Sequence, residues 1–223
     1  MISVIIPTLN EQDYIGSLLD SLSNEFVDKV EIIVVDGGSS DGTTEIVSHY
    51  QEVMLIASEE GRAIQFNFGA QHSKGEILFF IHADSQLPDR WREQIMDIVD
   101  QGNCVAGTFY LKFDKEGFWY HLYSRLSRIN GSIFTYGDQG LFVRKIEFME
   151  IGGYPSLPIM EDYEILFRMR KVGHVTKLDS PITTSARKFS KNGVVLQQLK
   201  NITTVIMYIV GVSPSRLVKW YNR

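Results

Sequence analysis

The chain has 223 residues, of which 44% are hydrophobic and 22% are charged, and its formal net charge is −5. This is an ordinary globular composition, and the length is enough for one sizeable core or two small ones. The acidic balance and the lack of a basic block argue against nucleic acid as a partner. The single cysteine, Cys104, excludes an internal disulfide framework, fits a reducing compartment and is typical of a small buried apolar residue.

Apolar runs separated by amphipathic stretches fill the first hundred residues. Short runs rich in Val and Ile are typical of strands that are buried on both faces, and the stretches between them have helical periodicity. This alternation predicts a Rossmann-like α/β fold, in which the carboxyl ends of parallel strands meet at one edge. Asn10 is the expected cap of the first helix. The expected strands span 2–7, 30–35, 53–57 and 77–81, and the expected helices span 11–22, 43–50, 62–71 and 90–99.

The second half has longer and more aromatic segments, and no linker or repeat separates it from the first. We therefore expect a single domain over residues 1–223. Phe118, Trp119, Tyr120 and Tyr123 have helical spacing, which is typical of a core but also suits a platform for a sugar ring or a lipid tail. The expected strands span 103–113, 139–143 and 174–178, and the expected helices span 118–129, 161–172 and 194–212.

The last helix has two interpretations. Its longest apolar run, 205–212, is shorter than the roughly 20 residues that cross a bilayer, so it is either a packing helix or a helix that touches a membrane surface. Trp220 and Tyr221, which lie among cationic residues, favour the membrane interface. No signal-peptide pattern follows Met1, so we expect a cytoplasmic protein, and the membrane interpretation places it against the inner face of the membrane.

Two acidic residues follow predicted buried strands. Asp36 ends the run Val30–Val35 and precedes a turn rich in Gly and Ser, and Asp84 follows the run that ends at Ile81. Ligands bind at this edge of open α/β sheets, where converging acids can hold a ribose hydroxyl or a divalent cation that bridges phosphates. The alternative is that both acids only cap the helices that follow them.

Three further polar clusters have open interpretations. Arg62, Gln65 and Asn67 lie on an otherwise apolar helix and suit either a phosphate or a solvent-facing stripe. Glu161 and Asp162 precede an apolar helical stripe, so they are either ordinary acids at a helix start or include a general base. The last cluster is cationic. It could stabilise the negative charge that develops on a leaving diphosphate, or it could be an ordinary solvent-exposed turn. Its cationic members are Arg187, Lys188 and Lys191.

Several common sites are not supported by the sequence. The five histidines have no metal-binding spacing and no cysteine partners, and among them only His82 lies where chemistry is expected. No Gly-x-Gly-x-x-Gly and no phosphate-loop Gly-Lys-Ser/Thr follows the first strand. These observations disfavour dinucleotide dehydrogenases and P-loop nucleotide hydrolases.

Taken together, the motifs resemble those of the inverting family-two glycosyltransferases with the GT-A fold, in their order and spacing from Ile2 to Lys191. The chain is most similar to a small subgroup with His-Ala-Asp and Ser-Ala-Arg motifs. The segments that carry the resemblance are ISVIIPTLNE (Ile2–Glu11), IIVVDGGSSDGT (Ile32–Thr43), GRAIQFNFGA (Gly61–Ala70), GEILFFIHAD (Gly75–Asp84), GDQGLFVRK (Gly137–Lys145) and IMEDYEILFRMRKVG (Ile159–Gly173).

The resemblance implies a nucleotide-binding half at 1–100 and an acceptor half at 101–223. Asp84 would bind Mg²⁺ or Mn²⁺ on the diphosphate of a sugar nucleotide, and Arg187 would help to stabilise the departing diphosphate. Asp162 would be the catalytic base, with Glu161 as its neighbour. The acceptor is an unknown sugar or lipid-linked hydroxyl. The other residues implied at the donor site are Pro7, Thr8, Glu11, Asp36, Arg62, Asn67 and His82.

Two departures from the family pattern bear on this reading. His82 replaces the first acid of Asp-x-Asp, and an imidazole lacks the fixed negative charge of a carboxylate, so the metal dependence is open. The Gln-x-x-Arg-Trp region of processive synthases is not present, and Ser185–Phe189 only resembles its end. We therefore expect a non-processive enzyme.

Two other functions compete with this one. A sugar-phosphate nucleotidyltransferase would use a similar fold, but it needs a glycine-rich basic loop after the first strand, where this chain has Thr8–Glu11. A nucleotide-sugar-binding protein without transferase activity would explain His82 as a mark of lost catalysis. Release of pyrophosphate would favour the first, and tight binding without transfer would favour the second.

Overall fold

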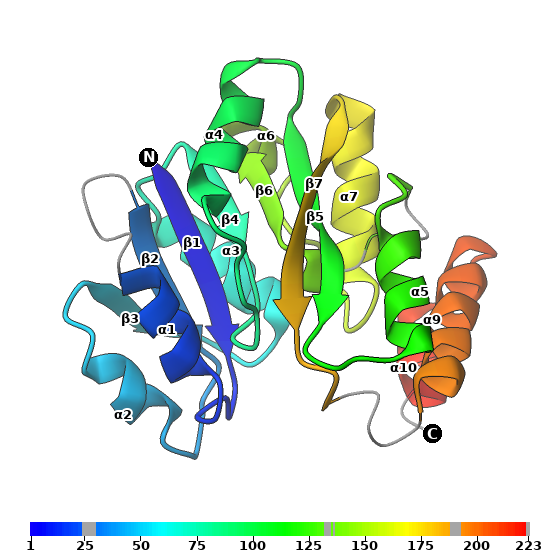
Figure 1. The fold of residues 1–223 in the computed structure, drawn as a ribbon, viewed down its shortest axis with the longest axis horizontal. Coiled ribbons are helices and arrows are strands. Elements are labelled where there is room, and N and C mark those ends of the chain that lie inside the picture. The colour runs from blue at the N-terminus through cyan, green and yellow to red at the C-terminus, as the bar shows by residue number, and fades with distance from the viewer. Residues whose placement is uncertain (24–29, 132–134, 136, 188–192, 222–223) are drawn as a thin grey trace.

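A seven-stranded sheet lies at the centre of the computed structural model, which describes residues 1–23, 30–131, 135, 137–187 and 193–221 (Figure 1). The strand order is β3-β2-β1-β4-β6-β5-β7. Strand β6 is antiparallel to both of its neighbours, and the other strands are parallel to one another. The strands are β1 (Ile2–Thr8), β2 (Val30–Asp36), β3 (Val53–Ala57), β4 (Ile77–Phe80), β5 (Ala106–Phe113), β6 (Leu141–Arg144) and β7 (Val175–Thr184).

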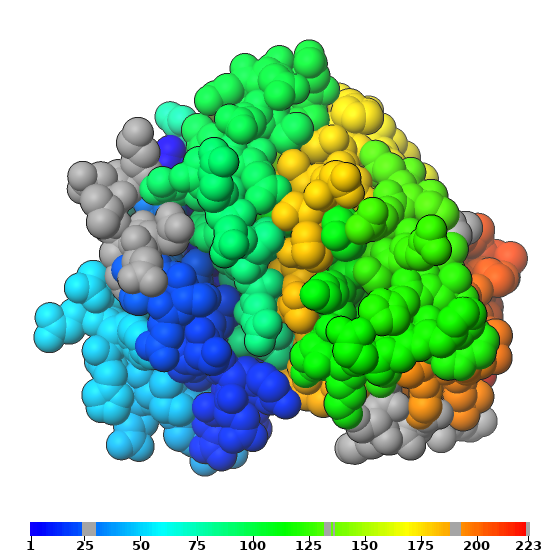
Figure 2. All heavy atoms as spheres, in the orientation of Figure 1, coloured from blue at the N-terminus to red at the C-terminus, as the bar shows by residue number. Residues whose placement is uncertain are grey.

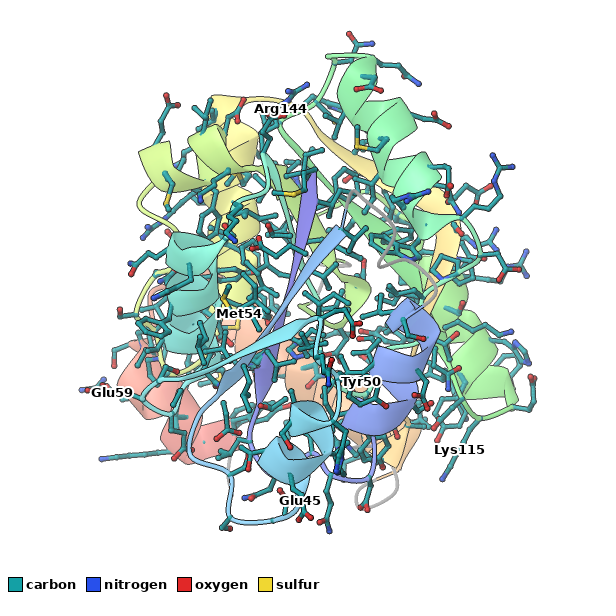
Figure 3. The ribbon with its side chains drawn as sticks, turned by 90° about the vertical axis from the view of Figure 1, so that its left-hand side faces the viewer. Glu45, Tyr50, Met54, Glu59, Lys115 and Arg144 are labelled. Atoms are coloured by element: carbon teal, nitrogen blue, oxygen red, sulfur yellow. The ribbon has the colours of Figure 1, made fainter. Side chains whose placement is uncertain are left out.

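Helices cover both faces of this sheet. On the first face, Tyr50 ties the end of α2 to α1, because its hydroxyl lies 2.7 Å from Asp20 (Figure 3). The helices are α1 (Ile15–Ser23), α2 (Thr43–Ser48), α3 (Arg62–His72), α4 (Trp91–Asp100), α5 (Phe118–Ser127), α6 (Lys145–Glu150), α7 (Glu161–Val172), α9 (Val194–Ile209) and α10 (Pro214–Tyr221), with the short 3₁₀ helix η1 (Gly137–Gln139) before β6.

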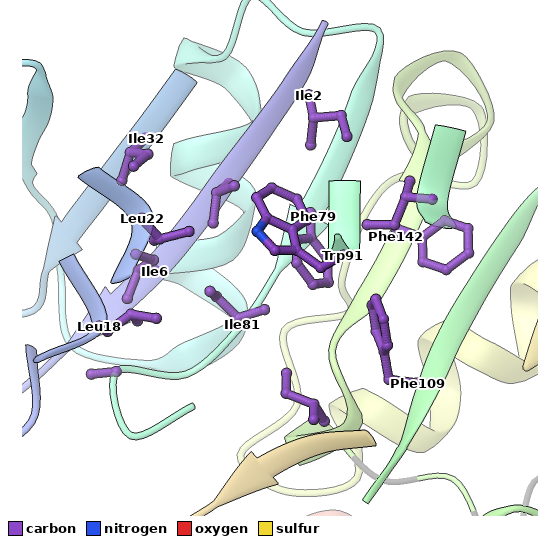
Figure 4. Close-up of a cluster of buried hydrophobic side chains, with 14 of the residues drawn as sticks. Ile2, Ile6, Leu18, Leu22, Ile32, Phe79, Ile81, Trp91, Phe109 and Phe142 are labelled. Atoms are coloured by element: carbon purple, nitrogen blue, oxygen red, sulfur yellow. The ribbon is translucent and has the colours of Figure 1, made fainter. Parts of the chain in front are cut away.

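Alternating strand side chains build two cores. Val34 packs with α1, α2, α4 and α5 on one face, and its neighbour Val35 packs with α3, α6 and α7 on the other. Phe79 stacks on Trp91 of α4 in the first core, with a ring distance of 5.3 Å (Figure 4). The burial of the Val- and Ile-rich runs on both faces confirms the predicted α/β class and the mostly parallel sheet.

The start of the first helix differs from the prediction. Helix α1 begins at Ile15 rather than at residue 11, so Asn10 does not cap it. Asn10 instead adopts the left-handed conformation, with φ of 56°, and its Oδ1 accepts a hydrogen bond of 2.8 Å from the backbone of Ser40. The Asn10 side chain thus joins two loops that are 30 positions apart in the sequence. The local sequence around Asn10 could not predict this hydrogen bond.

The second half also differs in its boundaries. Strand β5 begins at Ala106 rather than at 103, and β7 continues to Thr184 rather than ending at 178. The longer β7 is explained by its pairing with β5, which continues to Phe113. Helices α6 and α10 were not predicted. The last predicted helix, 194–212, ends earlier, as α9 at Ile209, shortly before Gly211, whose φ is +92°.

Gly69 allows helix α3 to approach strands β1 and β2 of the sheet closely. A Cβ atom at this position would lie 2.4 Å from a methyl carbon of Ile5 and 3.0 Å from one of Val35. Both neighbours belong to the buried second core, so the helix cannot easily move away from them. The position of α3, and of the residues that it presents to the strand ends, therefore depends on a glycine here.

We predict that Gly69→Ala lowers the free energy of unfolding by about 1–3 kcal/mol, because it overpacks the core. Urea denaturation of the variant and the wild type measures this. The matched control is Gly16→Ala in α1, where the nearest atom would be 3.5 Å from the new Cβ. That substitution should stabilise the protein by about 0.5–1 kcal/mol, since alanine favours the helix. Equal effects of the two substitutions would contradict the proposed close contact.

Candidate active site

The carboxylate of Asp36 organises the turn after β2. Its Oδ2 accepts hydrogen bonds of 2.9 Å from the backbone N–H groups of Gly38 and Ser39. Its Oδ1 accepts the hydroxyls of Thr8 at 3.1 Å and Ser39 at 2.5 Å. Asp36 is 6% exposed, so it is a buried side chain whose four hydrogen bonds organise the turn at the strand ends.

Gln65 joins the ends of β1 and β2 from the opposite layer. It is 3% exposed, and its Nε2 donates hydrogen bonds of 2.8 Å to the carbonyl oxygens of both Thr8 and Val35. The solvent-facing interpretation of this side chain is therefore wrong. Only contacts across the two layers could identify Gln65, because an amide on an amphipathic helix looks like a surface residue in the sequence.

A second cluster lies at the ends of β1 and β4, around Arg187. The guanidinium Nη2 is 2.7 Å from Oε1 of Glu11 and 3.5 Å from Oδ2 of Asp84, and the group lies over the ring of Tyr14 at 4.4 Å. The hydrogen bond that Arg187 donates to Glu11, and the nearby charge of Asp84, raise the pKa of Arg187 against the opposing effect of burial. One cation thus joins two acids from the strand ends, and Glu11 and Arg187 are 176 positions apart.

A backbone bridge holds this cluster together. The loop after β4 pairs with the end of β7, because Gln86 and Thr183 exchange hydrogen bonds of 2.7 and 2.9 Å. The backbone N–H of Ala186 also donates to Asp114 at 2.8 Å. These bonds place Arg187 of the second half of the chain beside Asp84 of the first half.

A third cluster joins α3 to α7. Arg62, at the start of α3, is 2.5 Å from Oε1 of Glu161 and 3.7 Å from Oδ2 of Asp162. Glu161 is almost fully buried and makes the shorter contact with Arg62, whereas Asp162 lies farther from the guanidinium. Oδ1 of Asp162 is buried and, within the described residues, has no hydrogen-bond partner. That oxygen is therefore a buried acceptor whose hydrogen-bonding capacity is unused by the described residues.

The electrostatics of this cluster favour proton transfer near neutral pH. Burial, reinforced by the neighbouring Glu161, raises the pKa of Asp162 to about 6, although Arg62 and His82 act in the opposite direction. Burial opposes the charge of Arg62, but Asp162 and Glu161 outweigh it and raise the pKa of that guanidinium. Asp162 is therefore a carboxylate that is ionised at pH 7 yet basic enough to accept a proton.

His82 connects the strand end of β4 to this third cluster. Its Nε2 lies 3.6 Å from Oδ1 of Asp138 in η1, a residue for which the sequence analysis assigned no role. Next to it, Gly137 leaves room for Asp162, since a Cβ atom at position 137 would overlap with the Asp162 carboxylate. The motif that contains Gly137 and Asp138 was recognised, but only the fold shows that both face His82 and Asp162.

Two predicted donor-site residues have mainly structural contacts. Asn67 exchanges two hydrogen bonds of 2.8 Å with the backbone of Tyr154, so its amide holds the segment between α6 and α7. Pro7 is buried within β1, next to Val35 of β2. Lys188 and Lys191 of the predicted cationic patch lie outside the described residues, and Arg187 is the member that the structure places at the site.

Comparison with known proteins decides the family. The model of glycosyl transferase family 2 matches residues 3–155. This chain belongs to that family. A relative from Haemophilus influenzae, named an uncharacterized glycosyltransferase, is 27% identical over 197 residues, which are 82% of this chain and 67% of that protein. The chain spans between 18% and 56% of the length of four other curated relatives.

Solved structures share the fold. Residues 1–349 of TarS from S. aureus in complex with UDP give a TM-score of 0.67 at 19% identity, over 92% of this chain and 65% of that one. The mannosyltransferase PcManGT from Pyrobaculum calidifontis, in complex with GDP-Man and Mn²⁺, gives 0.67 at 20% identity, over 96% and 66%. The GT-A fold expected from the sequence is thereby confirmed.

We predict that Asp36→Asn lowers the free energy of unfolding by about 1–3 kcal/mol, because an amide N–H₂ would face donors that now share a carboxylate. Chemical denaturation monitored by fluorescence tests this. Asp13→Asn, at an exposed position in the turn before α1, is the control and should change stability by less than about 0.5 kcal/mol. A similarly small effect of Asp36→Asn would show that the carboxylate does not organise the turn.

Proposed function

We propose that this chain is a non-processive, inverting glycosyltransferase, which moves a sugar from a nucleotide-diphosphate donor to an acceptor hydroxyl. The observation that carries the proposal is the convergence of three clusters at one edge of the sheet, around Asp36, around Asp84 with Arg187, and around Asp162. They offer a nucleoside contact, a diphosphate contact and a base. Membership of the family and the nucleotides in the two similar structures support this assignment.

The first half of the chain, 1–100, is the proposed donor side. The turn of Asp36 with Thr8, beside Pro7, would hold the nucleoside, since its carboxylate can accept ribose hydroxyls. Glu11 lies between this turn and Arg187, because its backbone N–H donates to Thr43 at 2.8 Å and its side chain pairs with the guanidinium. The second half, 101–223, supplies the base and the acceptor side.

The residues at Asp84 fit a divalent cation that the donor itself completes. Among the described residues, no three His, Cys, Asp or Glu side chains are grouped to hold a metal. Mg²⁺ sites often consist of one or two carboxylates plus substrate phosphates, and Asp84 offers such a carboxylate. Oε2 of Glu11 is buried without a hydrogen-bond partner in the described part of the chain. Arg187 therefore pairs with one oxygen of this carboxylate and leaves the other without a partner. A bound cation would neutralise charge on the diphosphate.

The proposed reaction is a single in-line displacement. The acceptor hydroxyl loses its proton to Asp162 as its oxygen attacks the anomeric carbon, and the bond between that carbon and the diphosphate oxygen breaks with its electron pair. Arg187 would move from Asp84 to the developing negative charge on the diphosphate, where it stabilises the leaving group. Arg62 pairs with both Glu161 and Asp162, so it holds the base in place and limits the rise of the pKa of Asp162.

Processivity and cellular context are also proposals. The sequence lacks the Gln-x-x-Arg-Trp motif, which supports single sugar transfer. We infer that the protein is cytoplasmic and that it contacts the inner face of the membrane through α9. We also infer that nucleic acid is not a partner. None of the helices in the described ranges has the length and hydrophobicity that crossing a bilayer requires.

The first test is calorimetric titration with UDP and GDP, with and without Mn²⁺. We expect one of the two to bind, and Mn²⁺ to strengthen its binding by on the order of tenfold or more, because the site is rich in carboxylates. Mn²⁺ alone should bind weakly, since the diphosphate supplies most of its ligands. Failure of both nucleotides to bind under either condition would rule out the proposed function.

Asp84→Asn should remove the effect of Mn²⁺ and leave metal-free nucleotide binding largely intact. The matched control is Asp89→Asn, at an exposed position of the same loop, which should behave as the wild type. A full Mn²⁺ effect in the Asp84 variant would exclude Asp84 as the ligand.

Asp162→Asn should lower the rate of sugar transfer by about 10²–10⁴-fold and leave nucleotide binding nearly unchanged, because an amide cannot accept the proton. In the wild type, kcat/KM should rise with pH and level off above about pH 6. The sign follows from the raised pKa, since the carboxylate is protonated and inactive below that value. Glu164→Gln, on the same helix turn, is the control and should keep both the rate and the pH profile.

A further inference from the structure

Helix α9 exposes an uninterrupted apolar face. Its exposed residues are six aliphatic side chains and Thr203, and none of them is charged. Leu196 is 62% exposed, and Ile206 is 53% exposed. The row repeats at helical spacing along the full length of α9, so it forms one stripe. Its apolar members are Val195, Leu196, Leu199, Ile202, Ile206 and Ile209.

The opposite face of α9 holds the helix against the protein through polar contacts. Tyr208 donates a hydrogen bond of 3.1 Å to Glu164 of α7, and Tyr221 of α10 accepts one of 2.8 Å from Gln197. Thr204 and Val205 are buried on this side. A surface helix normally turns its apolar face inward, so the outward stripe of α9 requires a separate explanation.

The end of the chain is strongly cationic. Residues 180–223 contain seven Lys and Arg residues and no Asp or Glu, whereas the remaining 179 residues contain 15 cationic and 27 acidic ones. The last segment therefore carries a charge of +7 and the rest −12, which together give the net −5. Of these cations, Arg216 and Lys219 are exposed on α10, which packs against α9.

Helix α5 extends the apolar surface next to α9. The two helices contact each other, and their green and orange atoms lie side by side at the lower right of Figure 2. Phe118 is 72% exposed and Trp119 50%, whereas Tyr120 and Tyr123 pack on Phe113. Only the first two aromatics are thus free of the core, and such side chains favour the headgroup region of a bilayer.

We propose that α9 lies flat on an anionic lipid surface, with its aliphatic stripe in the headgroup region and the cations of α10 against lipid phosphates. The combination of a wide apolar face, no acidic residue and several cations is typical of interfacial helices. A second copy of this chain fits less well, because a symmetric contact would bring two segments of charge +7 together.

This surface has a consequence for the acceptor that rests on the proposed function. Glu164, which binds Tyr208 of α9, lies two residues after Asp162 on α7. A lipid-bound α9 would therefore hold the proposed base close to the bilayer. An acceptor hydroxyl carried on a membrane lipid would then reach Asp162 more readily than a freely dissolved one.

Vesicle sedimentation tests the surface without any donor or acceptor, so its result is separate from that of the activity assays. We expect the protein to bind vesicles of phosphatidylcholine with 30% phosphatidylglycerol at least tenfold more tightly than pure phosphatidylcholine, and less tightly at high salt. No binding to the anionic vesicles at low salt would overturn the proposal. A dimer in light scattering without vesicle binding would also overturn it, in favour of a second copy.

Paired variants locate the contact. Leu199→Glu with Ile206→Glu should lower the affinity for anionic vesicles at least tenfold, and both positions are more than half exposed, so folding should be retained. The control is Ile146→Glu with Met149→Glu, an equal charge change at exposed apolar positions of α6, which should bind almost as the wild type does. Arg216→Gln with Lys219→Gln should reduce the salt dependence. Equal losses in the α9 and α6 variants would show that net charge, and not the α9 stripe, controls binding.

Discussion

The reversed direction of β6 is the constraint on which the site depends. Because β6 runs antiparallel between β4 and β5, its amino-terminal end lies at the carboxyl edge of the other strands. Asp138, just before β6, therefore faces His82, just after β4. Helix α7 then places Asp162 over Gly137. A parallel strand in this position would put the same residues at the far edge of the sheet, away from His82.

Surplus negative charge is the second property that organises the site. Among the described residues, the carboxylates of Glu11, Asp84, Glu161 and Asp162 pair with two guanidinium groups, those of Arg62 and Arg187. A diphosphate is itself strongly negative, so it needs cations that the protein has already used in ion pairs. The proposed cation at Asp84 and the transfer of Arg187 from Asp84 to the diphosphate both answer this requirement.

Each arginine also links parts of the chain that are far apart. Arg187 belongs to the segment after β7, yet it pairs with an acid after β1, and the bridge between Gln86 and Thr183 keeps these segments in place. Arg62 connects the start of α3 to the start of α7. The two ion-pair clusters therefore tie the first half of the chain to the second at the edge of the sheet.

Much of the fold could be predicted because it depends on local periodicity. The runs that form β1, β2, β3 and β4 are strand-like in themselves, and the acids after two of them were expected at one edge. Asn10, Gln65 and Asn67 could not be assigned in this way. Each is a polar residue in a loop or on an amphipathic helix, and its role is set by a backbone group 30 to 87 positions away. The same limit applies to the end of β7, which depends on its partner β5.

The sequence by itself determined the class of fold, the family resemblance and the acids that end the strands. Buried strands appear in the sequence as apolar runs, and the residues that follow each run lie at its carboxyl end. The sequence also determined the positive charge of residues 180–223, because this charge depends only on the amino-acid composition of that segment. Only the tertiary structure decided which acid is held by which arginine, that His82 faces Asp138 and that the apolar stripe of α9 points outward. These are contacts between distant segments, and their partners are chosen by the order and direction of the strands rather than by neighbours in the chain.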